Sequence, residues 1–222
     1  MKAIAIDGPS GAGKSTMAKK LAQELAFVYV DTGALYRAIG LHILSHKADA
    51  EDERSVSSFL PGLSIDLKYD QGVQKVLLNG RDVSDEIRTP EVSMAASAVS
   101  AHPPVREFLL LLQRRIAETN DVVMDGRDIG TVVLPKADIK IFLTASPEDR
   151  ARRRYEELSE KGIHADYNEV LEDMKTRDYN DSHRIAAPLR PAADAILVDT
   201  TGNELEVSVD ILVKLVKGNF NQ

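Results

Sequence analysis

The sequence predicts a three-layer α/β fold built around a central parallel sheet of five strands. Short runs rich in Val and Ile alternate with longer amphipathic stretches, which is the pattern of an α/β domain. The runs do not alternate strictly between apolar and polar residues, so we expect strands of a parallel sheet that is covered on both faces. The five runs are Ala3–Ile6, Phe27–Val30, Val122–Met124, Ile139–Leu143 and Ala195–Val198.

The amphipathic stretches predict the helices that cover this sheet. Two of them begin with clear signals: Ser146 precedes Pro147 and two acidic residues, and Asp166 stands three residues before Glu169, as in a capping box. We expect Gly162 to end the first of these two helices. The predicted helices are Lys14–Ala26, Ala34–Ser45, Pro104–Glu118, Pro147–Glu160, Glu169–Asp181 and Leu205–Lys217, with a further Ala/Ser/Val helix around Ser97.

One segment departs from the α/β rhythm. Leu63–Tyr69 alternates apolar and polar residues, Asp70-Gln71-Gly72 is typical of a turn, and Val73–Leu78 follows before Asn79-Gly80. Two such runs joined through Asp- and Gly-rich turns predict a small antiparallel meander. We therefore expect a single domain over residues 1–222 with an antiparallel insert at residues 63–88.

Composition narrows the function. The chain has 222 residues, 35 acidic against 28 basic side chains, a net charge of −7 and no cysteine. An acidic balance argues against a general nucleic-acid binder, and the lack of cysteine excludes disulfides, thiolate metal sites and a cysteine nucleophile. The apolar start Ala3–Ile6 is too short for a signal peptide or a membrane span, so we expect a cytoplasmic protein.

The strongest motif is the phosphate-binding loop of residues 8–15, Gly-Pro-Ser-Gly-Ala-Gly-Lys-Ser, which matches G-x-x-x-x-G-K-[ST]. Its glycines let backbone N–H groups surround a phosphate, and the helix that follows points its positive end at that phosphate. Lys14 is expected to reach the β- and γ-phosphates, and the Ser15 hydroxyl to bind Mg²⁺. The alternative, a Gly-rich turn without a ligand, is disfavoured because a predicted strand precedes the motif and a predicted helix follows it.

A phosphate-binding loop alone does not name the reaction. The guanine-recognising Asn-Lys-x-Asp segment of GTPases and the Leu-Ser-Gly-Gly signature of transporter ATPases are both missing from the sequence. The functions that remain are those of a small kinase or a stand-alone ATPase.

Two arginines follow predicted strands at the edge of the sheet where ligands of such folds bind. Asp31 begins a segment that reaches Arg37, and Asp125 begins a segment that contains Arg127. Two Arg side chains and a hydroxyl would suit a second phosphate. The alternatives are that Arg37 lies on a helix surface and that Arg127 pairs with Asp128 or Asp125.

Two further clusters lie late in the chain. Arg177, Asp181 and Arg184 are spaced i, i+4 and i+7, which predicts one face of one helix; a solvated salt-bridge ladder is the alternative. Four arginines fall within residues 150–154 and repel one another. A phosphate between them would relieve that repulsion, so residues 150–166 are a candidate lid.

These motifs together resemble the bacterial cytidylate kinase family, and the resemblance covers nearly the whole chain. It is carried by residues 7–15, 31–37, 86–89, 105–106, 125–131 and 177–188. The resemblance implies a P-loop kinase fold with a nucleoside-monophosphate-binding subdomain and a helical lid. It also implies transfer of the γ-phosphoryl group of ATP to CMP or dCMP with Mg²⁺, by a cytoplasmic monomer.

The resemblance further implies roles for individual residues. The catalytic residues would be Lys14, Arg127, Arg153 and Arg184, with Ser15 on the metal. ATP would be bound by Gly8, Pro9, Ser10, Gly11, Ala12, Gly13, Lys14, Ser15, Thr16, Arg150 and Arg154. The CMP phosphate would be bound by Arg37 and Arg127, near Thr32 and Tyr36. The ribose would be bound by Arg177 and Asp181. The cytosine would be bound by Ser97, Arg106 and Asp128.

Elementary chemistry supports this division. A carboxylate such as Asp128 accepts well from the exocyclic amine of cytosine, whereas uracil presents an oxygen there, a mismatch of ~1–3 kcal/mol. Ser97 is alternatively a small packing residue in its helix. The acceptor phosphate, with a second pKa of about 6, needs no general base.

Two rival functions remain. A P-loop kinase for another acceptor, such as another nucleotide or shikimate, differs from the first hypothesis only in its substrate. A nucleotide-dependent RNA-binding or switch module would need a basic stripe with aromatic residues, and aromatic residues make up only 5% of this acidic chain.

Overall fold

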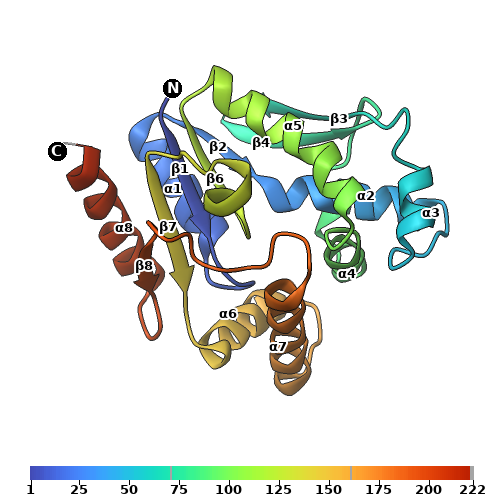
Figure 1. Cartoon of the computed structure of the whole chain (residues 1–222). Helices are drawn as coiled ribbons and strands as arrows, with labels where there is room; N and C mark the ends of the chain where they lie inside the picture. The colour runs from blue at the N-terminus through green and yellow to red at the C-terminus, as the bar shows by residue number, and fades with distance from the viewer. Residues whose placement is uncertain (71, 161, 221–222) are drawn as a thin grey trace. The chain divides into compact units, whose positions relative to one another are not determined.

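The computed structural model describes residues 1–70, 72–160 and 162–220, which form two compact units (Figure 1). The first unit comprises residues 1–29 and 121–222, and the second comprises Val30–Asn120. No helix within the described ranges is both long and apolar enough to cross a membrane.

The five predicted strands are confirmed and form one sheet in the order β2-β6-β1-β7-β8. The central strand β1 pairs in parallel with β6 on one side and with β7 on the other, and β7 pairs in parallel with β8. The register sets Asp7, the last residue of β1, beside Gly126, the last residue of β6. The strands are β1 (Ala3–Asp7), β2 (Val28–Asp31), β6 (Val122–Gly126), β7 (Ile139–Thr144) and β8 (Ile196–Asp199).

Helices α1 (Lys14–Leu25) and α8 (Leu205–Phe220) pack on this sheet and on each other. Their apolar residues join those of β1, β6, β7 and β8 in one core, whose fully buried members include Ile4, Met17, Leu21, Ile141 and Leu212. Strands β1 and β6 are buried on both faces, as the absence of strict alternation predicted, whereas β8 at the edge of the sheet exposes Leu197.

Helices α6 (Pro147–Glu160) and α7 (Tyr167–His183) lie side by side (Figure 1). The predicted start signals are confirmed: Ser146 Oγ accepts from Asp149 N at 3.2 Å, and Asp166 Oδ1 accepts from Glu169 N at 3.1 Å. Gly162 follows the end of α6 with φ +69°, the left-handed conformation that a glycine adopts readily.

One prediction in this region is wrong. Helix α7 ends at His183, and Arg184 is its C-cap with extended backbone angles, so Arg177, Asp181 and Arg184 do not share one helix. The helix stops because the Asp181 carbonyl accepts the amide of Leu189 at 2.7 Å and not the amide of the next helical turn. Arg184 still lies near Asp181, with 3.6 Å between their charged groups.

The second unit combines helices with the predicted antiparallel meander. Strands β3, β4 and β5 form a three-stranded sheet in that order, and Leu67 pairs with Val76 in its centre. Asn79 and Gly80 both have positive φ, which confirms the turn expected there, whereas Gln71 of the other expected turn lies outside the described residues. The elements are α2 (Thr32–Ser45), α3 (Glu53–Ser58), β3 (Ile65–Asp70), β4 (Val73–Leu78), β5 (Arg81–Asp82), η1 (Glu86–Arg88), α4 (Pro90–Val99) and α5 (Pro103–Thr119).

Helices α2 and α4 cross at Gly40. A Cβ atom at this position would lie 2.9 Å from the backbone nitrogen of Ala96, so only a glycine lets the two backbones approach this closely.

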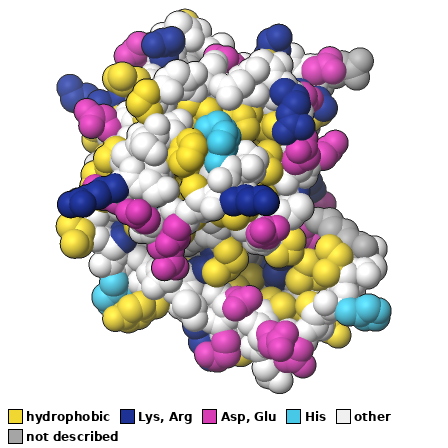
Figure 2. Space-filling model, turned by 90° about the vertical axis from the view of Figure 1, so that its right-hand side faces the viewer, with side chains coloured by type: hydrophobic (Ala, Val, Ile, Leu, Met, Phe, Trp, Pro, Cys, Tyr) yellow, Lys and Arg dark blue, Asp and Glu magenta, His cyan; other side chains and the backbone are white. Residues whose placement is uncertain are grey.

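Charged side chains of both signs are interspersed on the face of the molecule that Figure 2 shows. Such mixing is typical of an ordinary solvated surface, whereas a nucleic-acid-binding face carries a stripe of basic residues.

Candidate functional site

The phosphate-binding loop runs from the end of β1 to the start of α1, as the sequence predicts. Gly8 adopts φ +150°, and a Cβ atom there would lie 1.9 Å from the Leu143 carbonyl oxygen, so the loop begins in contact with the backbone of β7. Lys14 Nζ donates to the Pro9 carbonyl oxygen at 2.6 Å and folds back over the loop. The motif is therefore a compact turn at the carboxyl end of the central strand, where ligands of such sheets bind.

Lys14 is buried among charged groups of the first unit. Burial lowers the pKa of Lys14 well below its ordinary value, and Arg127 lowers it further, while Asp125, Asp181 and Asp7 act against this. A phosphate arriving beside Lys14 would favour the charged amine, because an opposite charge within a few ångströms restores the ionised form.

Asp125 is a functional candidate that sequence reasoning did not assign. Its Oδ2 accepts from Ser15 Oγ at 2.9 Å, and its Oδ1 accepts from Tyr29 Oη at 2.9 Å. A hydroxyl beside a carboxylate provides the hard oxygen donors that Mg²⁺ prefers, so these residues fit the ion. The available signal was the position of an acid at the end of the strand that precedes Arg127.

Arg127 forms an ion pair with Asp181, while Asp125, one of the partners weighed from the sequence, acts on it electrostatically. Its Nε donates to Asp181 Oδ2 at 2.8 Å, which joins the end of β6 to α7. Burial alone would raise the pKa of Asp181, but Arg127 and Arg184 outweigh it and hold that pKa below its usual value. Asp181 is therefore a carboxylate that orients arginines.

Arg184 completes this cluster. Its guanidinium lies 3.7 Å from Asp128 Oδ1 and 3.6 Å from Asp181 Oδ1, and its side chain is 7% exposed. Arg177 acts on Asp181 electrostatically from the same helix α7. Within the first unit the structure thus brings together Lys14, Arg127, Asp128, Arg177, Asp181 and Arg184.

Arg150 reaches the phosphate-binding loop from α6. It donates to the Ser10 carbonyl oxygen at 2.9 Å and to the Ala145 carbonyl oxygen at 2.9 Å, and it lies 2.6 Å from Asp178 Oδ2 of α7. This buried arginine connects helices α6 and α7 to the loop.

Arg153 and Arg154 point to other partners. Arg153 donates to Asp149 Oδ2 at 2.9 Å and to the Thr200 carbonyl oxygen at 2.7 Å, after the end of β8. Arg154 donates to Glu157 Oε2 at 2.9 Å. The repulsion that a phosphate was expected to relieve is therefore already reduced by acids and carbonyl groups of the chain itself.

The second unit holds its own group of arginines around Asp31, the N-cap of α2. Asp31 Oδ1 accepts from Ala34 N at 3.0 Å, Arg88 donates to Oδ2 at 3.1 Å, and Arg37 lies 3.9 Å from Oδ2. Burial would raise the pKa of Asp31, but Arg37 and Arg88 together lower it. Thr32 follows directly and is buried, whereas Arg88 was assigned no role from the sequence.

Tyr36 and Arg106 meet in the same unit, and Ser97 is linked to them through its backbone carbonyl. The Arg106 guanidinium lies over the Tyr36 ring, 5.6 Å from its centre, and donates to the Ser100 carbonyl oxygen at 3.1 Å. Ser100 Oγ in turn donates to the Ser97 carbonyl oxygen at 2.8 Å. An aromatic ring and a guanidinium thus lie together, which suits a planar base with hydrogen-bonding edges.

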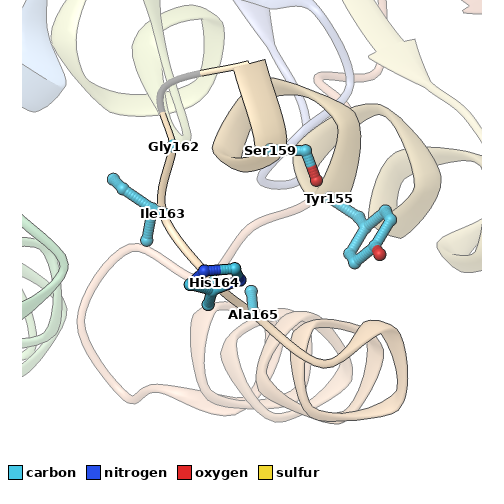
Figure 3. A pocket seen from close by; sticks show the side chains of 6 residues that line it. All are labelled: Tyr155, Ser159, Gly162, Ile163, His164 and Ala165. Atoms are coloured by element: carbon cyan, nitrogen blue, oxygen red, sulfur yellow. The ribbon is translucent and has the colours of Figure 1, made fainter.

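A pocket of about 210 Å³ lies where α6 gives way to α7 (Figure 3). It falls inside the candidate lid but contains none of the residues predicted to bind ATP or CMP. Its lining consists of Tyr155, Ser159, Gly162, Ile163, His164 and Ala165.

Comparison with known proteins identifies relatives of this chain. The family model for cytidylate kinase matches residues 4–218. A cytidylate kinase of Carboxydothermus hydrogenoformans is 51% identical to this chain over 213 residues, which is 96% of each chain. A cytidylate kinase of Caldanaerobacter subterraneus is 53% identical over 216 residues, which is 97% of this chain and 95% of that protein. Among solved structures, an uncharacterized protein from Eubacterium ventriosum matches with a TM-score of 0.52 at 13% identity, covering 98% of this chain and 99% of the other, and supports the fold alone.

Proposed function

Because the chain belongs to the cytidylate kinase family, we propose how its residues divide the work of phosphorylating CMP and dCMP with ATP. The observation that carries the proposal is that Lys14, Arg127, Asp181 and Arg184 gather beside the phosphate-binding loop. Two anionic substrates need a site of this kind, because their mutual repulsion opposes transfer.

We assign ATP to the loop and its neighbours. The loop amides and Thr16 hold the phosphates, Lys14 meets the β- and γ-phosphates, and Arg150 fixes the loop through the Ser10 carbonyl oxygen. Ser15 and Asp125, which share a hydrogen bond, would hold Mg²⁺, and the ion would neutralise phosphate charge. Arg153 and Arg154 would act on ATP only by exchanging the partners they have here, so their assignment depends on lid movement.

The acceptor nucleotide is assigned to two sets of residues. In the first unit, Arg127 holds the CMP phosphate, Arg177 and Asp181 hold the ribose, Arg184 lies by the transferred group and Asp128 accepts from the cytosine amine. In the second unit, Arg37, Thr32 and Tyr36 serve the phosphate, and Ser97 and Arg106 serve the base.

The reaction needs no general base. A phosphate oxygen of CMP attacks the γ-phosphorus, the bond to the β,γ-bridging oxygen breaks, and ADP leaves with that electron pair. The attacking phosphate is largely a dianion at neutral pH, so no proton has to be removed. Arginines and Lys14 position the two groups in line and neutralise their charge, while Asp128 selects the base.

The remaining assignments follow from the same proposal. Residues 1–222 act as one P-loop kinase domain, with residues 63–88 as the insert of the acceptor-binding part and residues 150–166 as the lid. The protein acts as a cytoplasmic monomer on small-molecule substrates, without nucleic acid or membrane. The cysteine-free composition is compatible with that compartment.

A panel of acceptors tests the proposal. ADP release is measured with CMP, dCMP, UMP, AMP and shikimate at equal concentration, each with and without Mg²⁺. We expect Mg²⁺-dependent release that is fastest with CMP or dCMP. Faster release with AMP or shikimate, or release that no acceptor stimulates, would contradict the proposal.

A further inference from the structure

Asp7 is a buried carboxylate that the mechanism above does not use. It is the last residue of β1, directly before the phosphate-binding loop, and is 3% exposed. Its Oδ1 accepts from Ile129 N at 2.7 Å and its Oδ2 accepts from Gly130 N at 2.8 Å. The two oxygens therefore hold two successive amides of the loop of residues 127–133, which includes the short helical turn η2 (Ile129–Val133).

That loop begins with Arg127 and Asp128, and it is held at several other points. Gly126 is in register with Asp7, and Arg127 is fixed by Asp181. The Asp128 carbonyl oxygen accepts from Val132 N at 2.8 Å and from Val133 N at 3.2 Å. The peptide group that follows Asp128 is thus held at both its carbonyl oxygen and the Ile129 N–H, which restricts the backbone that carries the Asp128 side chain.

Asp7 faces the loop and is shielded from solvent in this arrangement. It is buried, and each carboxylate oxygen already accepts from a backbone amide. Two neighbouring N–H groups that face one side chain require two acceptors, and an amide side chain offers only one. The carboxylate is therefore required by the loop, and an isosteric amide would direct a donor at one of the two N–H groups.

We propose that Asp7 is a positioning residue that fixes the loop behind Arg127 and Asp128, and thereby sets the preference for cytosine over uracil. The inference rests on the proposed function, since it takes Asp128 to contact the cytosine amine. It links the strand that leads into the ATP-binding loop to the residues assigned to the acceptor.

A substitution at Gly130 tests the contact between Asp7 and the loop without changing Asp7. A Cβ atom at this position would lie 3.3 Å from Asp7 Oδ2 and 3.2 Å from Lys140 Cδ. The Lys140 stem cannot swing away easily, because its Nζ donates to the Pro135 carbonyl oxygen at 2.6 Å and to Asp194 Oδ2 at 2.8 Å. We therefore expect Gly130→Ala to shift the loop by a few tenths of an ångström while the Asp7 carboxylate remains.

The test is the ratio of kcat/KM for CMP to kcat/KM for UMP. Global destabilisation lowers both values equally and leaves the ratio unchanged, whereas displacement of Asp128 changes it. We expect Asp7→Asn and Gly130→Ala each to lower the ratio about tenfold. Asp138→Asn is the matched control, because Asp138 Oδ2 accepts from Ala3 N at 2.7 Å at the opposite end of β1, and its ratio should not change.

Asp128→Ala separates this inference from the proposed function. If Asp128→Ala lowers the ratio and Asp7→Asn and Gly130→Ala leave it unchanged, the inference is wrong and the proposed function stands. If Asp128→Ala leaves the ratio unchanged, the base-recognising role in the proposed function is wrong, and with it the inferred effect of Asp7 on specificity.

Hydrogen exchange on the wild-type protein tests whether Asp7 anchors the loop amides, and this test does not require Asp7→Asn to fold. The amides of Ile129 and Gly130 should exchange at least about a hundredfold more slowly than exposed loop amides, because a buried carboxylate holds them. Exchange at the rate of exposed loops would overturn the inference.

Discussion

Arg127 donates to Asp181 across 2.8 Å and so joins the end of strand β6 to helix α7. These residues lie 54 positions apart in the chain, and neither was paired with the other from the sequence. The ion pair holds a guanidinium beside the buried Lys14, where charge must be neutralised during phosphoryl transfer.

Removal of this guanidinium should reduce turnover without unfolding the protein. We expect Arg127→Ala to lower kcat with CMP by about a thousandfold, because a positioned arginine stabilises the charge of the transferring group. Arg184 lies 3.6 Å from Asp181 and remains to pair with it, so the thermal unfolding midpoint should change little. Turnover close to that of the wild type in steady-state assays would show that Arg127 has no role in catalysis.

Asp125 should control the response to Mg²⁺. Asp125→Asn keeps the shape of the side chain but removes the charge beside Ser15, so we expect the half-saturating Mg²⁺ concentration to rise at least about tenfold. ADP release is titrated with Mg²⁺, and Mn²⁺ binding in the presence of ATP is followed by electron paramagnetic resonance. Asp121→Asn, which alters an acid that accepts from Lys2 N, is the control. Equal titrations for Asp125→Asn and wild type would show that Asp125 does not serve the metal.

Asp31 should make stability depend on pH. The pKa of Asp31 is lower in the folded than in the unfolded protein. The ionised carboxylate therefore stabilises the fold fully at pH values above its unfolded pKa, which is near 4. This contribution is lost as the pH falls through the folded pKa. Asp31→Asn should therefore cost about 1–2 kcal/mol at pH 7, because Arg37 and Arg88 lose their partner, and progressively less below pH 4.

Urea unfolding of both proteins at pH 7 and at pH 3.5 checks this expectation. The mutant retains an N-cap side chain for α2, so helix capping contributes little to the difference. A difference in unfolding free energy that grows as the pH falls would contradict the assigned charge interaction.

Asp128 should determine base preference more than stability. We expect Asp128→Ala to lower the ratio of kcat/KM for CMP to that for UMP by about tenfold, since a contact to the cytosine amine contributes ~1–3 kcal/mol of discrimination. The guanidinium of Arg184 keeps Asp181 as a partner in the mutant. A ratio equal to that of the wild type in competition assays would assign base recognition to other residues.

The sequence predicted the elements of this fold well where local patterns decide. The five strands, the loop and the caps at Ser146 and Asp166 depend on residues that are neighbours in the chain. The position of Arg184 outside α7 could not be predicted in this way, because the chain leaves the helix where the distant Leu189 N–H donates to the Asp181 carbonyl oxygen.

The sequence predicted which residues belong to the site but not which of them pair with one another. Arg127, Asp181 and Arg184 were singled out from the sequence, yet their mutual contacts depend on how α7 packs beside the end of β6. Asp125 and Asp7 escaped assignment because a buried acid at a strand end has the same local pattern whether it serves a metal, a loop or the core.

The most direct test of the account compares CMP-dependent ADP release by the wild-type protein and by Lys14→Ala. We predict that CMP stimulates release by the wild type, that Lys14→Ala lowers the stimulated rate by about a thousandfold, and that both proteins unfold at similar temperatures. A mutant that retains the wild-type rate, or a wild type that releases ADP equally with and without CMP, would contradict the account.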